Sequence, residues 1–214
     1  IVRDSGAAPV RGDLDGVAAM TEGARGADVA FHSAAHLGEW GTREEFERGN
    51  VTGTRNVLAA AREAGVRRFV HVGTEAALMH GEPLVMVDER APLQPGSKAL
   101  YSATKAQAEI AVLEAGGGGL ETVVVRPRLV WGVGDTTILP GVREAADKGR
   151  WAWIGGGRHR TSTTHVDNVV EGLWLGATKG APGGVYFVTD GEPVVFREFF
   201  ERLLGTQGVA LGDR

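Results

Sequence analysis

The chain has 214 residues and a formal net charge of −4, with 43% hydrophobic and 23% charged residues. This length suits one sizeable domain, or one domain with a small appendage. The composition is that of an ordinary globular protein, and an acidic balance without a basic stripe argues against a nucleic-acid partner. Because the chain has no cysteine, disulfides, thiol catalysis and thiolate metal sites are excluded. No run approaches the ~20 apolar residues that span a bilayer, and no signal-peptide pattern opens the chain, so we expect a cytoplasmic protein without a membrane partner.

Short strand patterns alternate with helical patterns along the chain. In order, we expect a strand at 29–31, a helix at 44–64, a strand at 68–72, a helix at 100–115, a strand at 122–125, a helix at 139–148, a strand at 151–154, a helix at 166–178, a strand at 185–188 and a helix at 196–204. The almost wholly apolar run at 122–125 is typical of a strand covered on both faces. The pattern therefore predicts an α/β fold, a doubly wound, Rossmann-like parallel sheet with a small C-terminal substrate-binding part.

The first residues do not supply the glycine-rich unit with which dinucleotide-binding sheets of this kind open. Ile1-Val2-Arg3 has the pattern of a strand end instead. We therefore expect that the glycine-rich unit is absent from the sequence shown. We divide the chain into a dinucleotide-binding core at 1–132 and a mixed core and substrate-binding part at 133–214.

Tyr101 and Lys105 are four residues apart in a predicted helix, so their side chains share one face about one turn apart. A free tyrosine has a pKa of ~10 and is a poor base at pH 7. A fixed ammonium beside the phenol favours the phenolate and lowers that pKa. The spacing therefore indicates a proton-transfer catalyst. The plainer interpretation is an amphipathic helix with a half-buried Tyr101 and a surface Lys105.

Seven short segments carry a family resemblance by their joint order and spacing. They are Gly12–Leu14, Phe31–Ala35, Asn50–Val57, Phe69–Thr74, Tyr101 with Lys105, Arg126–Gly132 and Thr164–Val169. With them the chain resembles the extended short-chain dehydrogenase/reductases, and most closely the branch of 3β-hydroxysteroid dehydrogenases and NAD-dependent epimerases and dehydratases. The resemblance covers about 11–188. It implies an NAD(P) cofactor, a small-molecule substrate, and a homodimer formed through the helices at 44–64 and 100–115.

The resemblance implies four catalytic residues. Tyr101 would be the general acid/base, and Lys105 would lower its pKa and bind the nicotinamide ribose. Thr74, where the family usually has serine, would position the substrate oxygen, and Asn50 would support the proton-relay geometry. From the residues alone, Thr74 could equally satisfy a loop amide, and Asn50 could cap the start of a helix.

The resemblance also implies a set of cofactor-binding residues. Besides Tyr101 and Lys105, they are Arg3, Asp13, Leu14, Ala34, Ala35, Pro127, Leu129 and Val130. Asp13 would meet the adenine ring, and the small Ala34 and Ala35 would let the cofactor approach the backbone. Arg3 stands where an arginine would accept a 2′-phosphate, which favours NADP over NAD. Turns, tight packing and core edges are the plainer interpretations of these positions, and the spacing of the histidines predicts no metal site.

Three functions remain open. The preferred one is an NAD(P)-dependent oxidoreductase that transfers a hydride between nicotinamide and a hydroxyl or ketone of an apolar substrate, such as a steroid-like one. Its pocket walls could include Trp40, Trp131, Leu139, Trp151 and Trp153. The second is a nucleotide-sugar epimerase or dehydratase, but Thr161 stands where those relatives usually have an arginine, although Arg158 and Arg160 lie close by and could substitute for it. The third is a non-catalytic NAD(P)-binding regulator, against which the intact set of Thr74, Tyr101 and Lys105 argues.

Overall fold

The computed structural model describes residues 4–37 and 40–212. The chain forms two compact units. The first comprises the residues up to Arg126 together with Gly172–Phe187, and the second comprises Pro127–Glu171 together with the residues from Val188 onward. Each unit is therefore built from two separate stretches of sequence. The assignment of cofactor binding to 1–132 and substrate binding to 133–214 stays a prediction.

The first unit is organised around a four-stranded sheet with the order β1-β2-β3-β7. The strands are β1 (Val29–His32), β2 (Arg68–Val72), β3 (Glu121–Pro127) and β7 (Val185–Val188). β1 and β2 pair in parallel with His32 opposite His71, and β2 and β3 pair in parallel with Val72 opposite Val125. The carboxyl ends of these three strands thus lie at one edge of the sheet. The predicted α/β fold with a parallel central sheet is confirmed.

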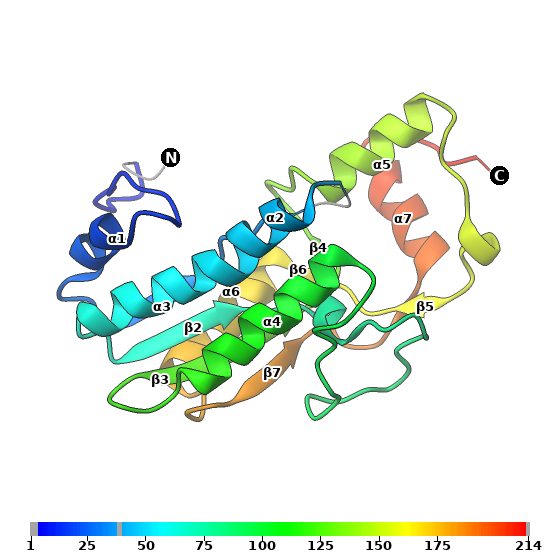
Figure 1. The fold of residues 1–214 in the computed structure, drawn as a ribbon. Helices are drawn as coiled ribbons and strands as arrows, with labels where there is room; N and C mark the ends of the chain where they lie inside the picture. Colours follow the sequence, from blue (N-terminus) through cyan, green and yellow to red (C-terminus); the bar gives the residue numbers. More distant parts are fainter. Residues whose placement is uncertain (1–3, 38–39, 213–214) are drawn as a thin grey trace. The chain divides into compact units, whose positions relative to one another are not determined.

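Helices cover both faces of this sheet (Figure 1). On one face, α3 (Gly53–Glu63) and α4 (Leu100–Glu114) pack on Phe69 and Val124. On the other face lies the C-terminal half of α6 (Val166–Thr178), where a Cβ added at Gly176 would come within 3.3 Å of the Val123 and Val125 side chains. Successive residues of β3 therefore face opposite helix layers. This double coverage explains the apolar run at 122–125.

The predicted helix at 44–64 is continuous but not uniform. After α1 (Val17–Ala24) and β1, it opens as α2 (Arg43–Phe46), with Thr42 and Glu45 forming a capping box. It continues as a π-helical segment, η1 (Glu47–Thr52), and then as α3. The helix ends before Gly65, whose φ of 78° suits the left-handed position that follows a helix. π-segments are frequent at functional sites, and this one contains Asn50.

The second unit has two small sheets and an aromatic core. β4 (Val130–Trp131) pairs in parallel with β6 (Thr164–His165), and β5 (Arg160–Thr161) pairs antiparallel with β8 (Val194–Val195). Two helices, α5 (Ile138–Asp147) and α7 (Phe196–Gly205), surround a core of Val142, Trp153, Phe200 and Leu204.

The strand predicted at 151–154 is wrong. The Trp151 and Trp153 rings instead pack edge to face with centroids 5.2 Å apart, inside the aromatic core. A short 3₁₀ turn, η3 (Ile154–Gly157), follows directly. Gly155 and Gly156 adopt positive φ values of 59° and 70° there, a left-handed conformation that ends any extended run.

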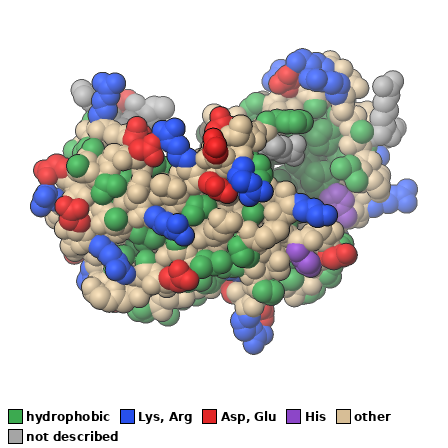
Figure 2. Space-filling view, in the orientation of Figure 1, with side chains coloured by type: hydrophobic (Ala, Val, Ile, Leu, Met, Phe, Trp, Pro, Cys, Tyr) green, Lys and Arg blue, Asp and Glu red, His purple; other side chains and the backbone are tan. Residues whose placement is uncertain are grey.

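The surface mixes charges of both signs. On the face shown in Figure 2, Lys and Arg side chains alternate with Asp and Glu side chains and with hydrophobic ones. This distribution agrees with the small net charge. Among the described helices, none combines the length and apolar character that crossing a bilayer requires.

Candidate active site

The carboxyl edge of the parallel sheet brings Thr74 and Tyr101 together. Thr74 lies two residues beyond β2 and caps the short 3₁₀ helix η2 (Glu75–Leu78), its Oγ1 accepting a hydrogen bond from the Ala76 amide at 3.2 Å. Tyr101 is the second residue of α4, and its phenol oxygen is hydrogen-bonded to the Thr74 side chain. Thr74 therefore satisfies a loop amide, as the plainer interpretation expects, while its hydroxyl also contacts the candidate acid/base.

Burial, not a neighbouring charge, dominates the environment of the Tyr101 phenol. Burial raises the pKa of Tyr101, and the hydrogen bond from Thr74 partly opposes this shift. The predicted lowering of this pKa by Lys105 is therefore not found in the protein alone. The Lys105 amine is directed at β2 instead, where it donates to the Val72 carbonyl. A phenol held neutral is suited to donate a proton.

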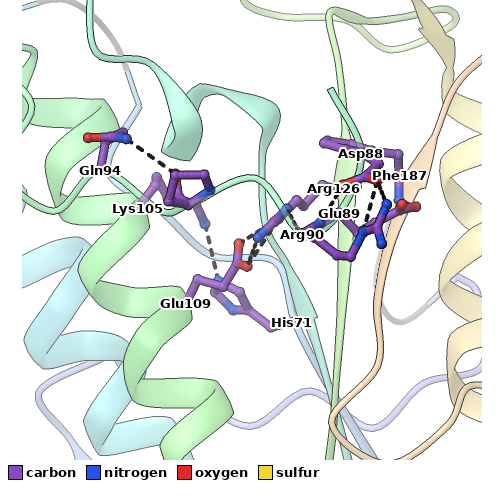
Figure 3. A network of polar contacts seen from close by, with 10 residues as sticks. His71, Asp88, Glu89, Arg90, Gln94, Lys105, Glu109, Arg126 and Phe187 are labelled. Atoms are coloured by element: carbon purple, nitrogen blue, oxygen red, sulfur yellow. Dashed lines mark hydrogen bonds and ion pairs between the residues drawn. The ribbon is translucent and has the colours of Figure 1, made fainter. Parts of the chain in front are cut away.

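Lys105 is a buried lysine, with 4% of its surface exposed, so the interpretation as a surface lysine is wrong. Its Nζ donates a hydrogen bond to the Val72 carbonyl at 2.8 Å. The same Nζ lies 3.5 Å from Nε2 of His71 (Figure 3). Burial lowers the pKa of Lys105 to about 8, and the negative charge of Glu109 opposes this shift. The amine therefore remains mostly charged at neutral pH.

Asn50 connects α4 to the loop that follows β1. Its Nδ2 donates to Thr104 Oγ1 at 3.0 Å and to the His36 carbonyl at 3.2 Å, and its Oδ1 accepts from the His36 amide at 2.7 Å. The side chain is buried inside η1, so the interpretation of Asn50 as a cap at a helix start is wrong. Both ends of the amide are used within the protein, which fits a role in positioning the loop and α4.

A buried ion pair lies beneath this edge and was missed from the sequence. Arg126 of β3 and Glu109 of α4 expose 2% and 0% of their side chains, and Nε of Arg126 donates to Oε1 of Glu109 at 3.0 Å. Arg126 also donates to the Glu89 carbonyl at 3.2 Å (Figure 3). A Cβ added at Gly73 would lie 3.1 Å from Glu109 Oε2 and 2.9 Å from Val124 Cγ1, so the chain before Thr74 lies directly on the pair. No local spacing predicts this pair, because its residues are 17 positions apart, on a helix and on a strand.

Two predicted cofactor residues, Asp13 and Leu14, form a turn against α3. Asp13 is exposed, and its Oδ1 accepts from the Asp15 amide at 3.0 Å. The Leu14 carbonyl accepts from Asn56 Nδ2 at 2.8 Å. Leu14 Cδ1 would lie 2.7 Å from a Cβ at Gly53, so this approach requires glycine. The turn is thereby fixed, and the Asp13 carboxylate is left on the surface.

The remaining cofactor residues are divided between the two units. Ala34 is exposed and Ala35 half-buried, just beyond β1 in the first unit. Pro127, Leu129 and Val130 belong to the second unit, where Leu129 has a positive φ of 42°, an unusual conformation for a leucine. Arg3 lies outside the described residues.

The second unit contains a cavity of about 330 Å³ whose lining includes Trp131, Leu139, His165 and Leu203. Asp190 fixes its wall, because its carboxylate accepts from Trp131 Nε1 at 2.7 Å and from the His165 amide at 2.6 Å. Of the aromatic residues predicted as pocket walls, Trp131 lines this cavity. Trp151 and Trp153 lie in the aromatic core, and Trp40 is 88% exposed.

The donor set at the carboxyl edge fits a nicotinamide dinucleotide. An exposed alanine leaves the backbone after β1 open to close approach, and the hydroxyls of Thr74 and Tyr101 lie beyond β2 and at the start of α4. Asp13 adds an exposed carboxylate that can accept hydrogen bonds from an amino or hydroxyl group. Ligands of doubly wound sheets bind at this edge. Within the described ranges, no three His, Asp or Glu side chains are grouped so as to hold a metal ion.

The parallel sheet with helices on both faces is a Rossmann-type fold, as in the short-chain dehydrogenase/reductases. A family model for the 3-beta hydroxysteroid dehydrogenase/isomerase family matches residues 2–214. The chain belongs to this family.

Curated relatives and solved structures agree with this assignment. The chain is 51% identical over 208 residues to the 4-hydroxy-2-methyl-3-oxo-4-farnesyl-3,4-dihydroquinoline-1-oxide ketoreductase of Stigmatella aurantiaca, covering 97% of this chain and 62% of the relative. It is 36% identical to the 2-alkyl-3-oxoalkanoate reductase of Stenotrophomonas maltophilia, covering 98% and 66%. The chain thus spans less than two thirds of either relative. A dTDP-glucose 4,6-dehydratase from Streptomyces venezuelae, solved with NAD bound, superposes with a TM-score of 0.79 at 26% identity, covering 92% of this chain and 63% of that one.

Proposed function

We propose that the protein is an NAD(P)-dependent oxidoreductase that reduces a ketone of an apolar small molecule, or oxidises the corresponding alcohol. The observation that carries the proposal is a neutral, half-buried Tyr101 phenol hydrogen-bonded to Thr74, with the Lys105 amine buried one turn further along α4. Family membership supports it. Two relatives named as reductases, with a 3-oxo group and a farnesyl or alkyl chain in their substrates' names, support an apolar ketone as substrate.

The side chains at the edge can perform the proton transfer that ketone reduction needs. The nicotinamide, when bound, supplies the hydride. As negative charge develops on the carbonyl oxygen, the Tyr101 hydroxyl donates its proton to that oxygen, and the Thr74 hydroxyl orients it. A positioned proton donor contributes roughly 10²–10⁴-fold in rate. Lys105 then stabilises the phenolate by its charge and holds the nicotinamide ribose.

The other cofactor contacts remain part of the proposal. Asp13 and Leu14 would hold the adenine end, Ala34 and Ala35 would let the pyrophosphate approach, and the nicotinamide side would be lined by Pro127, Leu129 and Val130. Solved relatives with NAD and with NADPH support a nicotinamide cofactor of either kind. We favour NADP because of Arg3, and we propose that the protein works in the cytoplasm. Comparing the dissociation constants of NADH and NADPH tests the preference; tighter binding of NADH would reverse it.

The test of the mechanism is Tyr101→Phe. We expect ketone reduction to fall by roughly 10²–10⁴-fold, while the dissociation constant for NAD(P)H stays nearly unchanged, because the ring remains and only the hydroxyl is lost. The chain offers a matched control in Tyr186→Phe, since the sequence has two tyrosines and the Tyr186 hydroxyl accepts from the Ala181 amide at 2.9 Å, away from Thr74. Wild-type rates in Tyr101→Phe would remove Tyr101 from the mechanism.

A nucleotide-sugar epimerase or dehydratase is the second candidate, and the likeness to a dTDP-glucose 4,6-dehydratase favours it. Against it, Thr161 is buried and its Oγ1 accepts from Nε of Arg128 at 3.2 Å, so this position offers no free cation to a diphosphate. Steady consumption of NAD(P)H with apolar ketones supports the first function. Conversion of a sugar nucleotide without net cofactor change supports the second, and tight cofactor binding without either activity supports a regulator.

We also propose that the protein is a homodimer that pairs through α3 and α4. A groove of about 330 Å³ runs between these helices and is lined in part by Arg55, Ala59, Ala111 and Glu114. Small side chains let helix backbones approach closely. Opposite charges on one face can complement each other across a two-fold axis, where the same patch meets itself.

A further inference from the structure

We propose that His71 is the positioning residue for Lys105, and that its neutral imidazole accepts a hydrogen bond from the Lys105 ammonium. This inference rests on the proposed function, since it assigns what orients the buried amine of Lys105, which we propose as the partner of Tyr101. His71 lies on β2, and α4, the helix that carries Tyr101 and Lys105, contacts this strand through the Lys105 amine.

The first argument is the direction of the amine. A lysine ammonium has three donors and no acceptor. Two of these donors are directed at β2. One points toward the Val72 carbonyl at 2.8 Å, and the other toward Nε2 of His71 at 3.5 Å (Figure 3). The acid on the same helix face, Glu109, is already engaged by Arg126. The imidazole is therefore the side chain that meets the amine.

The second argument is the protonation state of the imidazole. His71 is fully buried, and burial lowers its pKa well below the ordinary value, with the charges of Lys105 and His32 adding to the effect. A neutral histidine keeps one ring nitrogen as an acceptor and one as a donor. Because Nε2 faces the ammonium, the ring proton must be on Nδ1.

The third argument is the other ring nitrogen. Within the described part of the chain, Nδ1 of His71 is a buried nitrogen without a hydrogen-bond partner. Buried polar atoms without a partner are rare, and each calls for an explanation. Here the explanation is that the contact with Lys105 orients the ring, and in this orientation Nδ1 has no hydrogen-bond partner.

The charged and titratable groups around the amine are few. His71 faces it from β2, and His32 lies behind His71 on β1 with ring centroids 5.3 Å apart. Tyr101 and Glu109 are on its own helix, and Arg126 of β3 acts through Glu109. Replacing His71 by an apolar side chain would keep Lys105 buried but remove an acceptor. The amine would then lose its proton at lower pH.

The direct test needs neither cofactor nor activity. In the cofactor-free protein labelled with ¹⁵N-histidine, we expect the ring-nitrogen shifts of His71 to report the neutral Nδ1–H form at pH 7. We expect the Nε2 signal to move as Lys105 loses its proton near pH 8, and Lys105→Met to abolish this movement. An Nε2–H form at pH 7, or an Nε2 signal that ignores the Lys105 titration, would overturn the proposal.

The functional test is a pair of substitutions. In His71→Leu we expect the pH above which NAD(P)H binding and kcat/KM decline to fall by about one unit. His71→Gln, whose amide oxygen can accept from the amine, should restore most of the wild-type profile. His80→Gln, at an exposed histidine, is the control. Equal profiles for the Leu and Gln variants would count against the proposal.

If the Leu variant does not fold, the ¹⁵N shifts decide. If those shifts show the contact but no ketone is reduced by any form, the proposed function fails and the positioning role stands.

Discussion

Four titratable side chains are buried in surroundings that disfavour their charged forms. They are His32, His71, Lys105 and Tyr101. Burial is the largest cause in each case, raising the pKa of Tyr101 and lowering those of the other three. The phenol is therefore kept as a proton donor at neutral pH, and the two imidazoles are kept neutral. Lys105 retains its charge up to about pH 8. One physical cause, desolvation, thus prepares both a donor and the acceptor we assign to Lys105.

The buried His32 makes the protein sensitive to acid. Its pKa is about 4 in the fold and 6.5 in the unfolded chain, so between these values the unfolded chain binds a proton that the folded chain does not. The contribution of the neutral His32 to the unfolding free energy is therefore complete above pH 6.5 and is lost as the pH falls toward 4. The difference corresponds to about 3 kcal/mol of unfolding free energy. Urea unfolding at pH 7 and at pH 4.5, compared between the wild type and a variant without this imidazole, measures the part that is lost by pH 4.5.

His32→Gln is the matching variant for this measurement. Gln keeps a group that can bond to Thr54 Oγ1, which lies 2.9 Å from Nε2 of His32, but it cannot titrate. We expect the variant to lose clearly less stability than the wild type on acidification. Equal losses in the two proteins would show that His32 does not contribute to the acid sensitivity.

The sequence predicted which residues gather at the edge, but not how they are oriented. The four-residue spacing places Tyr101 and Lys105 on one helix face, and the structure has both on α4. Which way the Lys105 amine turns depends on β2, whose packing against α4 is a tertiary contact without a local signal. For the same reason the direction of the Tyr101 pKa shift could not be predicted, because it follows from burial and not from sequence spacing.

At the scale of elements, the Arg126–Glu109 pair joins β3 to α4 and ties both to the segment between Thr74 and Tyr101. Arg126 donates to the Glu89 carbonyl, its guanidinium lies 5.5 Å from the centre of the Phe187 ring, and Glu89 Oε1 accepts from the Phe187 amide at 3.0 Å (Figure 3). The segment that links the two candidate catalytic residues is therefore anchored to the sheet at Glu89.

We expect Arg126→Met to be strongly destabilising, by about 3–5 kcal/mol, because it leaves the Glu109 carboxylate buried without its partner. The double variant Arg126→Met with Glu109→Leu should recover part of this loss, since it removes both charges and fills the space with apolar atoms. Chemical denaturation of the wild type, both single variants and the double variant gives the coupling energy. Additive effects in this cycle would contradict the pairing, and a surface pair such as Arg25–Glu22 serves as the reference.

Element prediction succeeded where one local pattern decided the structure. The run at 122–125 became β3 because its apolar side chains serve both faces of the sheet. The π-segment at 47–52 carries no such pattern, since its Asn50 contacts His36 and Thr104 from other elements. The predicted strand at 151–154 failed because two tryptophans with an apolar neighbour fit an aromatic cluster as well as a strand.

At the scale of the whole molecule, the chain leaves its first unit at Pro127 and returns to it at Gly172. The returning stretch supplies half of α6 and the edge strand β7, so the sheet is completed by residues that follow much of the second unit in sequence. A single division of the sequence near residue 132 could not capture this return, because sequence order reports neighbours along the chain and not in space. In the sheet order β1-β2-β3-β7, β3 and β7 are neighbours although the residues at 127–171 lie between them in the sequence.

The proposed homodimer is the last property at this scale that can be tested. A stable interface buries about 1,200–2,000 Å² in total, and the exposed side of α3 and α4 presents small Ala59 and Ala111 beside Arg55 and Glu114. We expect the wild type to sediment as a dimer. Ala111→Arg should sediment as a monomer with an unchanged circular dichroism spectrum, because a long cation there would prevent the close approach of a second copy of α4.

The control for this experiment is Ala152→Arg, which adds the same side chain at an exposed position of the second unit and should leave the dimer intact. A wild type that sediments only as a monomer at assay concentration would refute pairing through this face. A dimer that survives Ala111→Arg would place the interface elsewhere, because the added guanidinium would block the close approach of a second copy to this face.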